Sequence, residues 1–185
     1  MRPPGCRWVA LDISADELGL APPGSYDSVV VADVERSVTD LAESFDLIVS
    51  WQVLEHVRHL DLALANLHAY LRPKGRLVAM FSGRFAFFAI ANRVLPHRVA
   101  VAALHGLHGR RPESIFPAYY DRCNYSALKS LLSDWQHVEI LPIYRGGYYL
   151  SFSAQLQKAY IRYENLVVRN DWRNLATHYL ITAEK

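Results

Sequence analysis

The stretch WVALDIS, residues 8–14, decides the fold expected for this chain. Its apolar run ends on a carboxylate, Asp12, which is typical of a parallel strand buried on both faces. In doubly wound nucleotide-binding folds, an acid at this place follows a glycine-rich loop by about 20 residues. Counting back from Asp12 by that spacing passes Met1, so we expect the first strand and its glycine loop to be missing from this sequence.

Four apolar segments in the first half predict buried strands, at residues 8–12, 28–32, 45–50 and 76–81. Helical patterns separate them, and the clearest is the leucine-rich segment 60–71, which Pro73 and Gly75 end. Alternation of strands and helices predicts a parallel sheet with helices on both faces. Ligands bind such sheets outside the carboxyl ends of the strands, which is where Asp12 and Asp33 fall.

The second half predicts helices at residues 85–95, 99–107, 124–132 and 155–168, and strands at residues 138–144 and 177–184. No internal repeat or low-complexity linker appears, so we expect residues 1–185 to form a single α/β domain. Residues 82–123 are expected to be an inserted lid or substrate-binding region within that domain.

The composition is that of an ordinary globular chain. Of 185 residues, 51% are apolar and 21% are charged, and the net charge of +2 gives no reason to expect a nucleic-acid partner. Cys6 and Cys123 are too few for a disulfide framework and lack metal-like spacing. We see no signal peptide and no apolar run of about 18 residues, so we expect a cytoplasmic protein without a transmembrane segment.

The charges are unevenly distributed. Residues 62–112 contain no Asp or Glu but hold eight basic residues, Arg72, Lys74, Arg76, Arg84, Arg93, Arg98, Arg110 and Arg111. This asymmetry favours an anionic or lipid-like acceptor. The apolar helix expected at residues 85–95 has two interpretations: a lid in peripheral contact with a membrane, or a cap that packs over the cleft.

Taken in order, the segments WVALDIS, VVADVE, FDLIVSWQVLEHV and LRPKGRLVAMF resemble successive motifs of class I S-adenosylmethionine-dependent methyltransferases. The likeness is to methyltransferase type 11, the branch that includes the ubiquinone-biosynthesis O-methyltransferases. The segment YYDRCNYSALKSLL and a last antiparallel pair of strands also resemble that family's closing part. The resemblance implies a Rossmann-like, doubly wound, mostly parallel sheet. It also implies S-adenosylmethionine as cofactor and methyl transfer to oxygen or nitrogen of a small-molecule acceptor.

The resemblance assigns cofactor contacts to two strand ends. In the family, the acid after the second strand binds the ribose hydroxyls, and here that acid is Asp12, with Ile13 beside it. The acid after the third strand meets the adenine amino group, and here that acid is Asp33, with Val34 beside it. A carboxylate at the end of a strand also has a simpler interpretation, as a cap for the next helix or a solvated loop acid.

The residues after the fourth family strand line the cofactor cleft, and here these are Ser50, Trp51 and Gln52. His56 follows in LEHV and is a candidate general base, because its pKa lies near neutrality. Some relatives bind a divalent metal here through a Glu-x-x-Glu-His pattern, but Gln52 replaces the first Glu and is a poorer ligand, so we expect no metal. Glu55 and His56 could equally be a helix-start acid and a core histidine.

The absence of the glycine loop leaves three explanations. The start codon is assigned too late, the sequence is a fragment, or the protein is a degenerate relative that no longer binds the cofactor. The functional alternatives are accordingly a non-catalytic binding module and a nicotinamide-dependent oxidoreductase. A sheet without this unit lacks a central strand and exposes strand edges that can pair with another chain.

Overall fold

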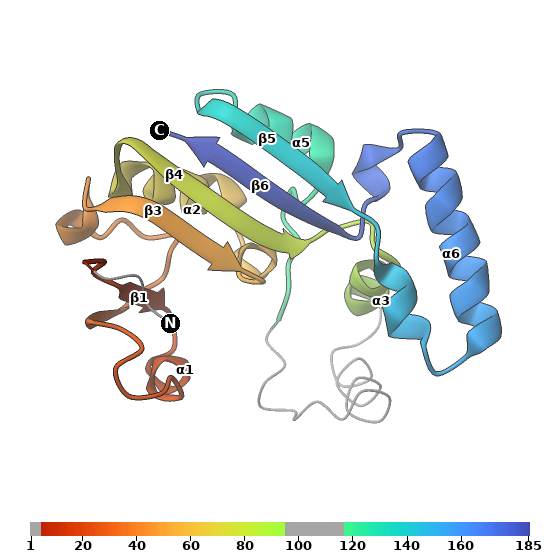
Figure 1. Cartoon of the computed structure of the whole chain (residues 1–185), viewed down its shortest axis with the longest axis horizontal. Coiled ribbons are helices and arrows are strands. Elements are labelled where there is room, and N and C mark those ends of the chain that lie inside the picture. The colour runs from red at the N-terminus through yellow and green to blue at the C-terminus, as the bar shows by residue number, and fades with distance from the viewer. Residues whose placement is uncertain (1–4, 95–116) are drawn as a thin grey trace.

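The computed structural model describes residues 5–94 and 117–185, in which strands and helices alternate (Figure 1). The first half contains β1 (Val9–Asp12), α1 (Ala15–Gly19), β2 (Ser28–Val31), β3 (Phe45–Trp51), α2 (Leu60–Tyr70) and β4 (Leu71–Ser82). The second half contains α3 (Phe87–Val94), α5 (Tyr125–Leu131), β5 (Gln136–Ile143), α6 (Ala154–Arg169) and β6 (His178–Glu184). Short 3-10 turns are η1 (Thr39–Leu41), η2 (Leu54–His56), η4 (Gly146–Leu150) and η5 (Arg173–Leu175).

The strands form two separate sheets. β1 and β2 pair in parallel, and the larger sheet has the order β3-β4-β6-β5, in which β3 and β4 are parallel while β6 is antiparallel to both of its neighbours. The α/β class with a C-terminal antiparallel pair is therefore confirmed. The sheet is not continuous, because β1 and β3 are not hydrogen-bonded to each other. In the doubly wound order 3-2-1-4-5, the first strand lies between these two, and no described residue supplies it.

Two boundaries differ from the sequence-based expectation. Helix α2 ends at Tyr70, and residues 71–75, expected to be a turn, form the start of the long strand β4. Pro73 prevents the helix from continuing, and Gly75 is required because a Cβ there would lie 2.8 Å from the Arg72 carbonyl oxygen. The expected turn at Gly146 is the start of η4, and a Cβ at this position would meet the Tyr160 ring at 2.6 Å.

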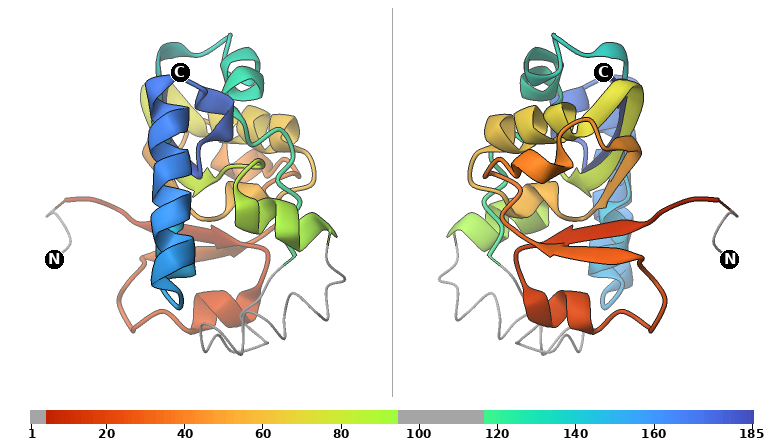
Figure 2. Two further views of the ribbon diagram at one scale, coloured as in Figure 1. Left: turned by 90° about the vertical axis from the view of Figure 1, so that its right-hand side faces the viewer. Right: turned by 90° about the vertical axis from the view of Figure 1, so that its left-hand side faces the viewer.

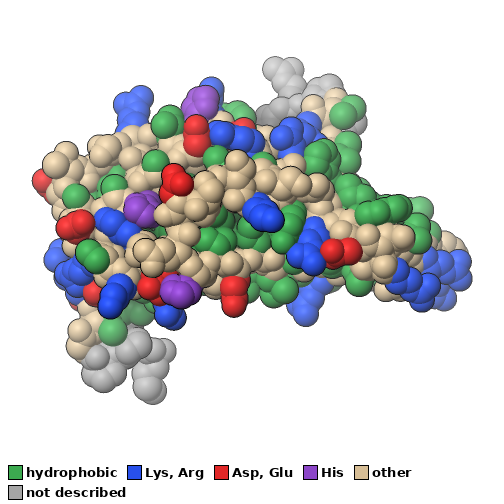
Figure 3. All heavy atoms as spheres, turned by 90° about the horizontal axis from the view of Figure 1, so that it is seen from above, with side chains coloured by type: hydrophobic (Ala, Val, Ile, Leu, Met, Phe, Trp, Pro, Cys, Tyr) green, Lys and Arg blue, Asp and Glu red, His purple; other side chains and the backbone are tan. Residues whose placement is uncertain are grey.

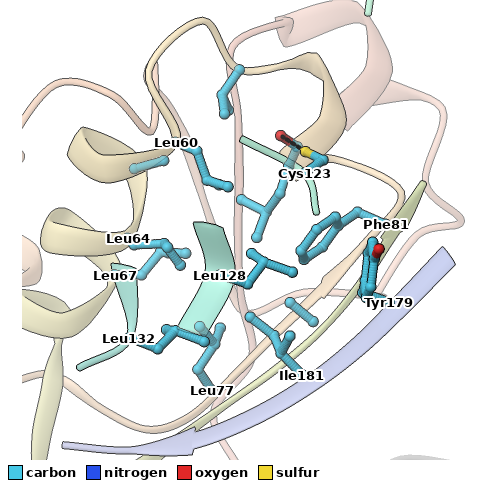
Figure 4. Packing of buried hydrophobic residues seen from close by; sticks show 14 of the residues in the cluster. Leu60, Leu64, Leu67, Leu77, Phe81, Cys123, Leu128, Leu132, Tyr179 and Ile181 are labelled. Carbon is cyan, nitrogen blue, oxygen red and sulfur yellow. Dashed lines mark hydrogen bonds between the residues drawn. The ribbon is translucent and has the colours of Figure 1, made fainter. Parts of the chain in front are cut away.

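One face of the larger sheet is covered by helices α2 and α5, which lie behind it in Figure 1. The buried residues of α2 are three or four positions apart along the helix, as the leucine spacing predicts. Figure 4 shows the packing of Leu60, Leu64, Leu67, Leu77, Phe81, Cys123, Leu128, Leu132, Tyr179 and Ile181. The small β1-β2 sheet adds Leu11 and Val30 to the edge of the same core.

The expected lid region at residues 82–123 is described only in part, since residues 95–116 lie outside the described structure. The helix predicted at residues 99–107 and the side chains of Pro96, His97 and Arg98 fall in that segment. Within residues 5–94 and 117–185, no helix is both long and apolar enough to cross a bilayer.

Two leucines on α2 test this packing. Leu64 is buried in the core, so Leu64→Ala is expected to lower the free energy of unfolding by about 2–5 kcal/mol through lost apolar burial and the cavity it leaves. Leu62 is exposed on the same helix, and Leu62→Ala is expected to change the free energy of unfolding by less than about 0.5 kcal/mol. Urea denaturation followed by circular dichroism measures both, and equal effects would contradict the assigned faces.

Candidate functional site at the carboxyl edge of the sheet

The carboxyl ends of three strands meet at one edge of the larger sheet. β3 and β4 run in the same direction, and β4 and β5 are both antiparallel to β6, so all three end on the same side. The segments that leave this edge are residues 52–57, residues 82–86 and the turn η4. Loops at such an edge are the usual ligand-binding region of an open α/β sheet.

The segment after β2 joins this edge through hydrogen bonds to the chain beyond β3. The backbone N–H of Arg58 donates to the Glu35 carboxylate. The side-chain amide of Asn66 donates to the carbonyl oxygen of Val34 at 2.8 Å. These contacts place Asp33 and Val34 close to the residues that follow β3, as the doubly wound topology predicts.

Asp12 and Asp33 play the same local role after their strands. Oδ1 of Asp12 accepts the Ser14 N–H at 2.8 Å, and Oδ1 of Asp33 accepts the Glu35 N–H at 2.9 Å. Each carboxylate therefore fixes the turn after its strand, which agrees with the capping interpretation. Among the described residues, neither Oδ2 has a hydrogen-bond partner, so each acid keeps one oxygen that can accept from a ligand.

The other predicted cofactor residues do not share one surface. Ile13 is 70% exposed, whereas Val34 is half-buried against the core. Ser50 pairs with Ala79 on the face covered by α2, and Trp51 points to the opposite face, where it is 63% exposed. Adjacent strand residues alternate between faces, so Ser50 and Trp51 cannot line one cleft from the same side.

A buried polar cluster lies where the chain leaves β3 and β4. Gln52 adopts the left-handed region with φ 55°, a backbone conformation seen at strained functional positions. Its Oε1 accepts from the Ser82 hydroxyl at 3.1 Å, and the Ser82 N–H donates to Oε1 of Glu55 at 3.1 Å. Nε2 of Gln52 and Oε2 of Glu55 are buried and have no hydrogen-bond partner among residues 5–94 and 117–185. Unpaired buried polar atoms are costly, so this cluster is suited to meet a polar ligand.

Glu55 is the most unusual ionisable group of this edge. Glu55 is only 3% exposed to solvent. This burial raises the pKa of the Glu55 carboxyl above its ordinary value. Burial together with the nearby Glu55 raises the pKa of Tyr120 to about 12 and also raises the pKa of the Cys123 thiol. The environment of Glu55 is therefore dry and disfavours negative charge.

The sequence analysis missed Glu55 and Ser82 as site residues. Glu55 was open to interpretation as a helix-start acid, and Ser82 follows an apolar strand without any recognised motif. The signal that could have found Glu55 is its place four residues beyond the end of β3, next to the edge where ligands bind. Its burial could not be read from the sequence, since the backbone N–H groups of Tyr119 and Tyr120, which donate to the Glu55 carbonyl, come from a distant segment.

His56 makes a different contact from the one expected of a general base. Its Nδ1 lies 2.8 Å from the carbonyl oxygen of Pro117. A carbonyl only accepts hydrogen bonds, so Nδ1 carries the proton in this contact. His56 thus attaches residue 117 and the chain after it to the carboxyl edge.

An aromatic cluster covers part of the same edge. Phe88 of α3 lies 4.5 Å from the ring of Tyr149 and 5.8 Å from that of His178, and Phe87 lies 4.9 Å from Tyr160. Helix α3 therefore packs on η4 and α6, while Ile90 and Val94 stay exposed.

The tyrosines between residues 119 and 149 make different contacts. Tyr120 hydrogen-bonds to Asn92 of α3 and lies near both Glu55 and Tyr149. Tyr120 therefore connects Glu55 to the aromatic cluster. Tyr125 instead accepts from Arg173 at 2.8 Å, and Tyr119 stacks under Arg58. Tyr148 is exposed and lines a groove against α6.

The basic residues of segment 62–112, which contains no Asp or Glu, do not form one patch among the described residues. Arg72 pairs with Asp46 at 2.8 Å, and Arg76 pairs with Glu184 at 3.1 Å. Arg93 donates to backbone carbonyls of Ala89 and Arg84. On the face drawn in Figure 3, Lys and Arg side chains occur in several places, with Asp and Glu side chains among them. Arg98, Arg110 and Arg111 lie outside the described residues.

No group of three or more His, Cys, Asp or Glu side chains in the described part of the chain is arranged to hold an ion. Gln52 and Glu55 are linked through Ser82, while His56 turns its Nδ1 to Pro117.

Comparison with known proteins identifies similar folds. A family model described as a methyltransferase domain matches residues 1–136. A SAM-dependent methyltransferase from Archaeoglobus fulgidus has 15% identity and a TM-score of 0.54, with 96% of this chain and 75% of that protein covered. The N-methyltransferase NodS from Bradyrhizobium japonicum, in complex with S-adenosyl-l-homocysteine, has 17% identity and a TM-score of 0.51, with 97% and 66% covered. A search of curated proteins found no match.

The solved structures are longer than this chain. The CMeT domain of the citrinin polyketide synthase has 17% identity and a TM-score of 0.52, and the chain covers only 38% of that structure. At these identities the likeness concerns the fold, which agrees with the sheet order and the carboxyl-edge site described above.

The raised pKa of Glu55 predicts a pH-dependent effect of Glu55→Gln. The folded protein holds the Glu55 proton to a higher pH than the unfolded chain does, so the ionised carboxylate lowers stability increasingly as pH rises through the folded pKa. The Gln side chain removes that penalty. The melting temperature of Glu55→Gln is therefore expected to rise relative to that of the parent chain as the pH increases above the ordinary carboxyl range, from about pH 5 to about pH 8.

The control is Glu17→Gln, which removes the same charge from the exposed helix α1. Its melting curve is expected to follow that of the parent protein. If the difference between Glu55→Gln and the parent stays constant from pH 5 to pH 8, the raised pKa of Glu55 is contradicted.

Proposed function

Because this chain belongs to the methyltransferase-domain family, we propose that it transfers a methyl group from S-adenosylmethionine to an oxygen or nitrogen atom of a small-molecule acceptor. The observation that supports this proposal is that the segment directly after Asp33 is hydrogen-bonded to the chain that follows β3, which also carries Gln52 and Glu55 of the buried cluster. The complex of NodS with S-adenosyl-l-homocysteine supports the same cofactor in a related fold.

The described residues fit the nucleoside part of this cofactor. Oδ2 of Asp12 would accept from the ribose hydroxyls and Oδ2 of Asp33 from the adenine amino group, while the opposite oxygen of each acid holds its turn in place. Val34 offers an apolar surface beside Asp33. For the methionine part, the described chain has no glycine cradle near β1, since a Cβ at Gly5 or Gly19 would meet nothing within 4 Å.

The bound cofactor supplies a methyl group activated by its positively charged sulfonium, and the chain supplies position and proton handling. Holding the acceptor in line with the methyl group accounts for much of the rate of such transfers. The acceptor atom also loses a proton, and we assign Oε2 of Glu55 to receive it, since that atom is buried and without a partner. His56 stays a candidate base through its other ring nitrogen.

The aromatic cluster over the edge completes the acceptor side of the proposal. Phe88 and Tyr149 would keep water away from the reacting atoms, and Tyr120 would link that cover to Glu55. The acceptor is then a small molecule with an ionisable or polar hydrogen and an apolar body. The unpaired Nε2 of Gln52 would orient it by donating to one of its oxygens.

Asp12→Asn tests the cofactor assignment. Asparagine keeps an oxygen for the Ser14 N–H but replaces the free carboxylate oxygen with a donor, so the affinity for S-adenosylhomocysteine is expected to fall by about tenfold or more. Isothermal calorimetry measures the affinity, with this chain and with the chain extended upstream in its reading frame. Asp16→Asn on the exposed surface of α1 is the control and is expected to leave the affinity unchanged.

Equal affinities for the parent and Asp12→Asn would remove Asp12 from the cofactor site. If neither the 185-residue chain nor the extended chain binds S-adenosylhomocysteine, the methyltransferase proposal fails. The non-catalytic binding module would then be the better interpretation.

A further inference from the structure

Helix α6 is attached to the rest of the protein along a narrow face. Only Glu164 and Val167 of its 16 residues are buried. Oε1 of Glu164 accepts the N–H of Gly146 at 2.7 Å, and the rings of Tyr160 and Phe87 pack with their centroids 4.9 Å apart. The left view of Figure 2 faces α6, which lies at the surface of the molecule along most of its length. Most of the surface of this helix therefore takes no part in the core.

One side of α6 carries a row of exposed apolar residues. Leu156, Tyr163 and Leu166 have the spacing that places side chains on one side of a helix, and we call them the apolar row. They are 50%, 38% and 50% exposed. Phe152, before the helix, and Trp172, after it, are also exposed, so aromatic residues flank α6 in the sequence. Exposed apolar residues grouped in this way mark an interaction site.

A row of basic residues runs beside the apolar row. Lys158, Arg162 and Arg169 are exposed and share the neighbouring side of α6, and we call them the basic row. None of the three forms an ion pair with another residue of the described chain. Residues 140–170 contain a single acid, Glu164, and its side chain is buried. At the right-hand end of Figure 3, where α6 lies, hydrophobic and basic side chains occur next to each other. The exposed charge of this surface is therefore positive.

The chemistry of the two rows selects the kind of partner. A bilayer with anionic headgroups offers phosphates to basic side chains and, beneath them, an apolar layer to leucine and aromatic side chains. A nucleic-acid duplex would engage only the basic row through its phosphates and would leave Leu156 and Leu166 in water. A second copy of the chain in a two-fold contact would bring the two basic rows together, and like charges repel each other. The combination of rows therefore fits an anionic lipid surface best.

We propose that α6 is a docking surface for a membrane whose lipids carry anionic headgroups. The helix lies along the headgroup layer, the apolar row enters the boundary with the acyl chains, and the basic row contacts lipid phosphates. The contact is peripheral, and it uses a different helix from the apolar segment at residues 85–95. It is a property of the chain in addition to the proposed methyl transfer.

Co-sedimentation with lipid vesicles tests this proposal on the 185-residue chain. One set of vesicles contains phosphatidylcholine alone, and the other contains about 40% phosphatidylglycerol, which is anionic. The chain is expected to partition about tenfold or more strongly into the anionic vesicles, because the basic row is attracted to their surface. Raising the sodium chloride concentration from about 0.05 M to about 0.5 M is expected to remove most of this preference, because salt screens the charges.

Two variants test the rows separately, each with a matched control. Arg162→Gln is expected to lower partitioning into anionic vesicles about fivefold, whereas Lys129→Gln on α5 is expected to leave it within about twofold. Leu166→Gln is expected to lower partitioning about threefold or more, because it removes an apolar side chain, whereas Leu62→Gln on α2 is expected to leave it unchanged. All four residues are exposed, so the melting temperatures are expected to stay close to that of the parent chain.

Three results would overturn the proposal. The first is equal partitioning into neutral and anionic vesicles, or none into either. The second is weaker binding of Arg162→Gln without weaker binding of Leu166→Gln, because a partner that uses the charges alone would then explain the surface. The third is a dimer in sedimentation equilibrium that Leu166→Gln dissociates, because a second copy would then cover the apolar row.

The test stays decisive if one variant fails to fold, since Lys158→Gln replaces Arg162→Gln and Leu156→Gln replaces Leu166→Gln on the same rows. None of these measurements depends on methyl transfer, so the proposed function can fail while this inference stands.

Discussion

The parallel pairing of β3 with β4 is the contact on which the larger sheet and its carboxyl edge depend, because it joins the segment after β3 to the α2 core. Among the described residues β3 is hydrogen-bonded to β4 alone, so it is an edge strand, and its side chains Leu47, Val49 and Trp51 are exposed. β1 and β2 form a separate parallel pair, and helix α1 buries none of its residues. The core is therefore built on the β3-β4-β6-β5 sheet and the face that its helices cover.

The carboxyl edge keeps its organisation despite that separation. Contacts from Glu35 and Asn66 hold the segment after β2 against the chain that follows β3 and carries Glu55. Ser82 connects Gln52 to Glu55, and burial disfavours the ionised form of Glu55. In the proposed function, Gln52 at this edge orients the acceptor and Glu55 receives its proton.

Local sequence determines the elements that could be predicted. Runs of apolar residues that end on Asp12 and Asp33, and leucines at helical spacing in α2, depend on neighbours in the chain, so the pattern reveals them. The sequence predicted a turn at Pro73, because proline ends a helix. In the structure Pro73 belongs to the first part of strand β4, where proline is tolerated.

Features that depend on distant segments could not be predicted. The burial of Glu55 requires the segment at Tyr120, and the opposite directions of Ser50 and Trp51 follow from the pairing of β3 with β4. Motif order contains no information about the face that each side chain takes, so the resemblance to methyltransferases could assign Ser50 and Trp51 to the cofactor cleft only as residues, without their directions.

The central claim is that the cofactor lies at the carboxyl edge, over the strand ends that bear Asp12, Asp33 and Gln52. The most direct measurement is a titration of the isotope-labelled chain, in its upstream-extended form, with S-adenosylhomocysteine followed by amide chemical shifts. We expect the largest changes in amide chemical shift at residues 12–14, 33–35 and 50–56. Shifts confined to the groove between η4 and α6, or no shifts at saturating ligand, would contradict it.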